Sequence, residues 1–183
     1  TLFASHADKL RFTGLSVVYT VPPYLSALAG GLGAHYAGGR IYTLPSVHIY
    51  QCRPASGVCP APYALGEEKM RAIVERRYQA WRDFLSEAQL ARLALSSGGD
   101  LRDYFRMLRL AITRSPMRDA LALSDAVLRD TEDAVRSDML PIAADDRAWL
   151  ARIMASHKPE LPSLDELPDF ARLQQGKYIL QYR

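Results

Sequence analysis

The chain has 183 residues, of which 49% are hydrophobic and 23% charged, as in globular proteins with a packed core. Its net charge of +3 is too small to indicate nucleic-acid binding by itself. No apolar run reaches the roughly 18 residues that suggest a transmembrane helix. Residues 1–9 also lack the basic start and apolar centre of a signal peptide. We therefore expect a cytoplasmic protein that does not contact a membrane.

Cysteine and histidine usage gives no sign of a metal site. Cys52 and Cys59 lie in a proline-rich loop, and no second closely spaced pair accompanies them. We expect two reduced thiols rather than a zinc site or a disulfide framework. The histidines have neither an i, i+4 partner nor clustered acids or cysteines; they are His6, His35, His48 and His157.

Residues 1–63 have an α/β pattern. Residues 2–11 are helix-like, and residues 15–22, with the sequence LSVVYTVP, have the composition of a buried strand. Residues 39–50 form a second β-rich run, and a short helix of small residues is expected between the two runs. A strand–helix–strand unit builds a parallel sheet, which needs further strands beside it. We therefore expect the sheet to be incomplete within this chain.

Residues 64–141 predict about four helices in a compact bundle. Ser86 and Gln89 have the spacing of a capping box, in which each residue hydrogen-bonds the other's backbone N–H. Gly98 and Gly99 separate this helix from the next one. Within the same region, the aromatic residues Tyr78, Trp81 and Phe84 are expected in the core, whereas Arg76 and Arg77 are expected on a solvated face, paired with Glu75 or Asp83.

The helix after the glycine pair has two distinct faces. Apolar residues recur at helical spacing from Leu101 to Ile112, and Asp100 can cap the free N–H groups of the first turn. Arg102, Arg106 and Arg109 follow one another on a different face. The pattern predicts that these arginines are presented to solvent.

Residues 142–183 form a third segment. A helix is predicted over residues 145–156, followed by a proline-rich connection and a second helix over residues 169–175. Gly176 ends that helix, and residues 177–183 read as a strand.

The order of these elements resembles the second half of an AAA+ ATPase module, a P-loop NTPase of the STAND type that bacterial signalling and defence proteins also use. The similarity rests on the strand VVYTVP, a helix, a second strand, a loop with an arginine, and GGDLR at the start of a helix. It implies a mainly α fold with a small α/β remnant. Residues 1–63 would be a truncated core sheet, residues 64–141 a helical lid and residues 142–183 a partial winged helix.

The resemblance also implies roles for three residues. Thr20 would stand at the strand tip that senses the γ-phosphate, and Arg102 would be the lid arginine that contacts the nucleotide. Arg40 is the nearest candidate for an arginine finger. Such roles suit these side chains, because phosphoryl transfer needs fixed hydrogen-bond donors and positive charge around the phosphate oxygens. A structural interpretation stays open for each: Thr20 as a β-favourable residue, and Arg102 as part of a solvated helix face.

Two elements of an ATPase are missing from the sequence. It contains no GxxxxGK[ST] phosphate loop and no apolar strand that ends in Asp-Glu to hold magnesium. We therefore expect a fragment, beginning after the missing strand, that does not hydrolyse ATP alone. ATP and Mg²⁺ would be cofactors of the intact parent ATPase, and no cofactor is expected for this chain by itself.

A second function class fits the same sequence. The chain could be a non-enzymatic helical protein-interaction module or a winged-helix DNA-binding module. DNA binding is not favoured, because residues 165–177 mix Arg172 and Lys177 with Asp165, Glu166 and Asp169. Protein partners or self-assembly through the ATPase module are the preferred expectation.

Overall fold

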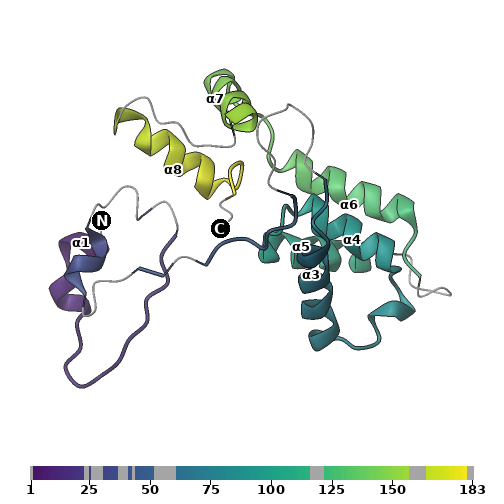
Figure 1. The fold of residues 1–183 in the computed structure, drawn as a ribbon, viewed down its shortest axis with the longest axis horizontal. Coiled ribbons are helices and arrows are strands. Elements are labelled where there is room, and N and C mark those ends of the chain that lie inside the picture. The colour runs from purple at the N-terminus through teal and green to yellow at the C-terminus, as the bar shows by residue number, and fades with distance from the viewer. Residues whose placement is uncertain are drawn as a thin grey trace. The chain divides into compact units, whose positions relative to one another are not determined.

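The computed structural model describes residues 2–22, 25, 31–36, 41–42, 44–51, 61–115, 122–156 and 164–180 (Figure 1). Within these residues the chain is mainly helical, as expected, and contains no β-strand. The chain divides into two compact units. The first comprises Thr1–Leu44 with Pro159–Ile179, and the second comprises Pro45–Lys158 with Leu180–Arg183. The division into three functional segments at residues 63 and 141 stays a prediction.

The first unit contains short helical elements. They are α1 (Leu2–Ser5), η1 (Ala7–Leu10), η2 (Leu32–His35), η4 (Leu164–Glu166) and α8 (Leu167–Gln175). Tyr19 is central to the N-terminal part, because its ring lies 5.8 Å from the ring of Phe3 and 6.0 Å from that of Tyr36. Its hydroxyl donates a hydrogen bond of 2.7 Å to the carbonyl of Leu10. An aromatic cluster therefore holds this segment to the N-terminal helical turns.

The predicted strands are wrong for the residues that the structure describes. Residues 15–21 make no backbone–backbone hydrogen bond to any described residue, and Val18 is 91% exposed. Among the described residues from 41 to 51, β pairing is limited to one antiparallel bridge, between Tyr50 and Pro62. Residues 177–180 are not a strand either. The physical reason is that strand-forming side chains make a strand only where a second backbone lies alongside.

The second unit contains the four-helix bundle that the sequence predicts. Its helices are α3 (Ala64–Arg77), α4 (Glu87–Ser96), α5 (Leu101–Arg114) and α6 (Asp125–Ser137), with the short η3 (Trp81–Asp83) between α3 and α4. Helix α4 packs against α3, α5 and α6, and α5 also packs along α6. The same unit includes α7 (Ala144–Ser156). The helices expected over residues 145–156 and 169–175 are thus confirmed as α7 and α8.

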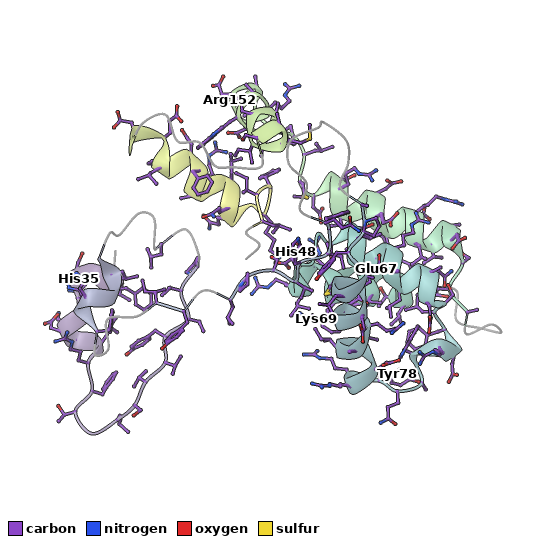
Figure 2. The ribbon with its side chains drawn as sticks, in the orientation of Figure 1. His35, His48, Glu67, Lys69, Tyr78 and Arg152 are labelled. Carbon is purple, nitrogen blue, oxygen red and sulfur yellow. The ribbon has the colours of Figure 1, made fainter. Side chains whose placement is uncertain are left out.

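The core of the bundle is formed by large side chains that are almost completely buried. Its largest members are Ile49, Met70, Trp81, Leu90, Leu93, Tyr104, Met107 and Leu128. Trp81 is in this core and Phe84 packs against it, as predicted. Tyr78 is not, because 51% of its surface is exposed; Figure 2 labels its position. Tyr78 follows the last residue of α3, where the chain leaves the helix that would have turned its side chain inward.

The helix ends follow the predicted capping chemistry. Ser86 and Gln89 form the capping box. The Ser86 hydroxyl accepts a 3.2 Å hydrogen bond from the N–H of Gln89, and the Gln89 side-chain oxygen accepts one of 3.0 Å from the N–H of Ser86. The Gln89 amide also donates 2.9 Å to the carbonyl of Leu123, just before α6. The carboxylate of Asp100 caps α5 by accepting from the N–H of Asp103 at 2.9 Å. These bonds satisfy backbone N–H groups that a helix leaves free in its first turn.

A segment that precedes the helices in sequence is part of the bundle. We call residues 45–51 the strap. The N–H of Val47 donates a 2.9 Å hydrogen bond to the carbonyl of Gly99, and the carbonyl of Ile49 accepts one of 2.8 Å from Tyr63. The Ile49 side chain is fully buried in the core. His48, labelled in Figure 2, has its ring 5.2 Å from that of Tyr63.

Two glycines allow the strap to lie this close. A Cβ atom on Gly66 would come within 1.9 Å of the carbonyl oxygen of His48, and one on Gly99 within 1.9 Å of the carbonyl oxygen of Val47. Gly99 also has a φ of +81°, which side chains other than glycine rarely adopt. Gly99, the second glycine of the pair before α5, therefore has a packing role: it gives the strap room to contact the α4–α5 turn.

An ion pair connects α4 to α6. The guanidinium of Arg92 donates two hydrogen bonds to Glu132, at 2.9 and 2.5 Å, and the hydroxyl of Ser96 donates a third at 2.7 Å. The Glu132 side chain is only 13% exposed. Burial by itself would raise the pKa of the Glu132 carboxyl. The hydrogen bonds from Arg92 and Ser96, together with the charge of Arg92, outweigh burial and lower that pKa.

We predict that Gly99→Ala destabilises the protein by about 2 to 4 kcal/mol, because alanine is strained at positive φ and its Cβ would overlap the Val47 carbonyl. Gly14 is the matched control, since it has a φ of +79° and a Cβ atom added there would meet no described atom within 4 Å. Gly14→Ala should therefore cost only the backbone strain. Melting temperatures by circular dichroism give the comparison; equal losses in the two variants would contradict the packing role of Gly99.

We predict that acid removes the contribution of Glu132 to stability. Because its pKa in the folded protein lies below the ordinary 4.5, the contribution is complete above about pH 4.5 and is lost as the pH falls through the lowered value. Urea unfolding at pH 7 should show a loss of about 1 kcal/mol in Glu132→Gln, and the variant should lose less stability than wild type between pH 5 and 3.

The control for this experiment is Asp133→Asn. Asp133 pairs with Arg136 at 2.9 Å, but its side chain is 67% exposed, so the pair should contribute little. If Glu132→Gln and Asp133→Asn changed the pH dependence equally, the buried position of Glu132 would not be the cause.

Candidate functional site

Arg102 lies in the first turn of α5, two residues after the capping Asp100. Its side chain is exposed, and it makes no ion pair or hydrogen bond with the residues that the structure describes. Free N–H groups and the helix dipole make the N-terminus of a helix partly positive. Here that positive end is shared with the carboxylates of Asp100 and Asp103, which lie in the same turn.

The other arginines of this face differ in how they are held. Arg106 forms an ion pair with Asp138, which follows the end of α6. Arg109 is exposed and, like Arg102, has no ion pair among the described residues. Arg102 and Arg109 are seven residues apart, close to two helical turns, so they lie on the same face about 10 Å apart along the axis. The face therefore presents two arginines that have no ion pair among the described residues, one on either side of an arginine that is paired.

Arg77, at the end of α3, contacts α5 through a ring rather than a carboxylate. Its guanidinium carbon lies 4.4 Å from the centre of the Phe105 ring, a cation–π distance. Arg76 and Arg77 are both exposed, as expected, but the expected pairing with Glu75 or Asp83 is wrong, because neither arginine forms an ion pair with a described residue. Glu75 instead accepts from Arg82 at 3.0 Å, because the turn after α3 brings Arg82 back toward that helix.

Of the other two candidate residues, the structure describes Thr20 alone. Thr20 is exposed and is not in a strand, so the strand-tip position that the sequence predicts for it is not formed within the described residues. Arg40 lies outside the described residues. Thr20 belongs to the first compact unit and Arg102 to the second, and each unit is described by itself.

An open hollow of about 380 Å³ lies on the surface of the bundle. It is lined by Ala72, Glu75, Arg76, Gln79 and Arg82. Arg82 is already paired with Glu75 and Glu87, each at 3.0 Å, and these hydrogen bonds raise its pKa. Arg82 is therefore neutralised, whereas Arg76 adds a positive charge that has no ion pair among the described residues, and the hollow does not include Arg102.

Metal ligation and membrane insertion find no support in the described part of the chain. No three His, Cys, Asp or Glu side chains there are grouped as metal ligands would be. None of the described helices has the length and apolar character needed to cross a bilayer. Cys52 and Cys59 lie outside the described residues.

Sequence reasoning did not identify the strap as part of the bundle. The signal for it was weak: Val47 and Ile49 are two β-branched residues in a proline-flanked run, and nothing in that run indicates a helical partner. It also did not predict buried polar groups in the core. The Tyr104 hydroxyl and the Trp81 Nε1 are buried without a hydrogen-bond partner among the described residues, and burial raises the pKa of Tyr104.

Comparison with known proteins identifies no relative of this chain. No protein-family model matches the chain, and no match is found among curated proteins or among solved structures. The features on which a functional proposal can rest are therefore those of the chain itself: the exposed Arg102 and Arg109, the Arg77–Phe105 contact, and the strap.

Proposed function

We propose that this chain supplies the sensor and lid part of an ATP-dependent molecular switch or remodelling ATPase, in which Arg102 contacts nucleotide phosphate. The chain alone would not hydrolyse ATP. The observation that carries the proposal is the state of Arg102: an exposed arginine without an ion pair among the described residues, at the start of a capped helix in a compact bundle.

The position of Arg102 suits an arginine that responds to phosphate. An arginine offers planar, permanently charged hydrogen-bond donors that match phosphate oxygens. The backbone at its base is well held, because Asp100 caps the helix and Gly99 accepts from Val47. A charged group on a fixed backbone loses less freedom on binding than one on a loop.

The segment around Thr20 is compatible with the same proposal. Residues 15–21 are rich in strand-forming side chains, yet their backbone makes no hydrogen bonds within the described residues, and Val17 and Val18 are exposed. Such a segment would be stabilised by adjoining the strands of a nucleotide-binding sheet. Thr20 would then be held at a strand tip, where its hydroxyl could orient a water molecule.

The proposal requires two elements from outside these 183 residues, namely a phosphate loop and a carboxylate for Mg²⁺. The gene that encodes the chain provides a direct test. Codons preceding Thr1 should encode a GxxxxGK[ST] loop and an apolar strand that ends in acidic residues. An open reading frame that starts at the chain, with no ATPase partner encoded beside it, would contradict the proposal.

A helical protein-interaction module is the second candidate. The observation that favours it is the packing role of Gly99, since the strap explains a glycine at this position without any nucleotide. The Arg77–Phe105 contact and the exposed Arg109 would then serve a protein partner, because arginine and aromatic side chains are frequent at the centres of interfaces. DNA binding remains the less favoured form of this alternative.

We predict that Arg102→Ala lowers nucleotide affinity or the hydrolysis rate by about ten- to a hundredfold in a protein that also contains the phosphate loop. The change removes a charge-assisted contact, worth roughly 1.5 to 3 kcal/mol. Stability should change by less than about 0.5 kcal/mol, because the side chain is exposed. ATP turnover and a denaturation curve measure the two effects.

The matched control is Arg109→Ala, which removes another exposed arginine from the same face. It should leave nucleotide binding nearly unchanged, because it lies about two turns from the helix N-terminus. Equal losses of turnover in the two variants would assign Arg102 to a general basic face instead of a nucleotide contact.

For the chain alone we predict no thermal shift with millimolar ATP and Mg²⁺. A ligand at a hundredfold excess over its Kd would stabilise the protein by about 2.7 kcal/mol, enough to raise the melting temperature by several degrees. Tripolyphosphate at the same ionic strength is the control for nonspecific charge effects. A rise with ATP but not with tripolyphosphate would mean that these residues bind nucleotide unaided.

A further inference from the structure

The strap contacts three helix ends at once. It meets the start of α3 through the Tyr63 N–H and Gly66, and the end of α4 through a 2.9 Å hydrogen bond from the Tyr50 hydroxyl to the Leu95 carbonyl. It meets the α4–α5 turn through Gly99. No other described loop of the bundle has backbone contacts of this kind with two glycines. The strap is also the first part of the second compact unit, which begins at Pro45.

The contact at Gly99 is backbone to backbone. The Val47 N–H donates to the Gly99 carbonyl, while the Val47 carbonyl oxygen occupies the space where a side chain on residue 99 would be. Backbone atoms cannot change rotamer to relieve an overlap. A shift of the strap at Val47 must therefore either break the 2.9 Å bond or move the turn.

The α4–α5 turn passes such a shift to the start of α5. The Gly99 N–H donates to the Ser97 hydroxyl at 3.1 Å, and the Asp100 N–H donates to the Ser97 carbonyl at 3.1 Å. Asp100 in turn holds the first turn of α5, by accepting from the N–H of Asp103 through its side chain and from that of Tyr104 through its carbonyl. Arg102 lies inside this hydrogen-bonded turn.

We propose that the strap is a positioning element that sets the first turn of α5 and transmits its own displacements to that turn. Val47 and Gly99 are its positioning residues, and Ile49 is the anchor that keeps the strap in the core. The consequence for Arg102, that its contact with phosphate depends on a seated strap, rests on the proposed function. The coupling between strap and turn does not.

The test removes one strap N–H at a time. Val47→Pro removes the donor to Gly99. Gln51→Pro removes the donor of the 2.8 Å bond to the Ala61 carbonyl at the other end of the strap, together with the 3.2 Å bond from the Gln51 side chain to the Pro62 carbonyl. Amide hydrogen exchange of the 183-residue chain is then measured by NMR. Val47→Pro should speed exchange at residues 99–104 by about five- to tenfold, the effect of losing one hydrogen bond, and leave the Tyr63 amide nearly unchanged.

Gln51→Pro should give the reverse pattern, with faster exchange at the Tyr63 amide, which donates to the strap carbonyl of Ile49, and little change at residues 99–104. Unchanged exchange at residues 99–104 in Val47→Pro, or an equal increase in α4, α5 and α6, would overturn the proposal. If Val47→Pro does not fold, Gly99→Ala replaces it, because its Cβ displaces the same strap carbonyl and should produce the same local pattern.

A second readout separates the coupling from the proposed function. In a protein with the phosphate loop, Val47→Pro and Arg102→Ala should be non-additive, so that the double variant loses little more nucleotide affinity than Arg102→Ala alone. If Val47→Pro speeds amide exchange at residues 99–104 but neither Val47→Pro nor Arg102→Ala lowers nucleotide affinity, the positioning role of the strap is retained and the nucleotide role of Arg102 is rejected. Full additivity would reject the link between the strap and Arg102.

Discussion

The helical bundle depends on the close contact between the strap and the backbones of Gly66 and Gly99. These two positions lie at the starts of α3 and α5, and at each one the strap carbonyl occupies the space of a missing side chain. Ile49 is buried in the core as a result, although it precedes the bundle in sequence. Because the strap also bonds to the end of α4, a single extended segment constrains the relative positions of three helix ends.

Charge is distributed over the bundle in two ways. Arg92 and Glu132 are paired where α4 and α6 pack, and Arg106 pairs with Asp138 beyond the end of α6. In both pairs the two partners belong to the bundle, and each pair connects two of its helices. Arg102 and Arg109 are left exposed on α5, so an anionic ligand or partner can reach them without breaking an ion pair between described residues.

The two compact units differ in how their backbone N–H and carbonyl groups are hydrogen-bonded. In the bundle, backbone N–H groups are hydrogen-bonded within helices and at their caps, and the strap backbone forms hydrogen bonds to the loops around it. In the first unit, residues 15–21 carry strand-forming side chains but have no backbone partner among the described residues. The contrast follows from the nature of the two kinds of element, since a helix forms its backbone hydrogen bonds within itself and a strand forms them only with a second backbone.

Local pattern was sufficient to predict the helices of the bundle and their caps, because spacing of apolar residues and capping chemistry act within a few residues. The capping box at Ser86 and Gln89, the Asp100 cap and the exposure of Arg102 are of this kind.

The rest of the structure was decided by contact between residues distant in sequence. The strap meets Gly99 from a distant part of the chain, Arg77 finds Phe105 instead of a nearby acid, and residues 15–21 find no second backbone among the described residues and so form no strand. Such contacts depend on how the packed helices are placed in space, which no local pattern of side chains contains.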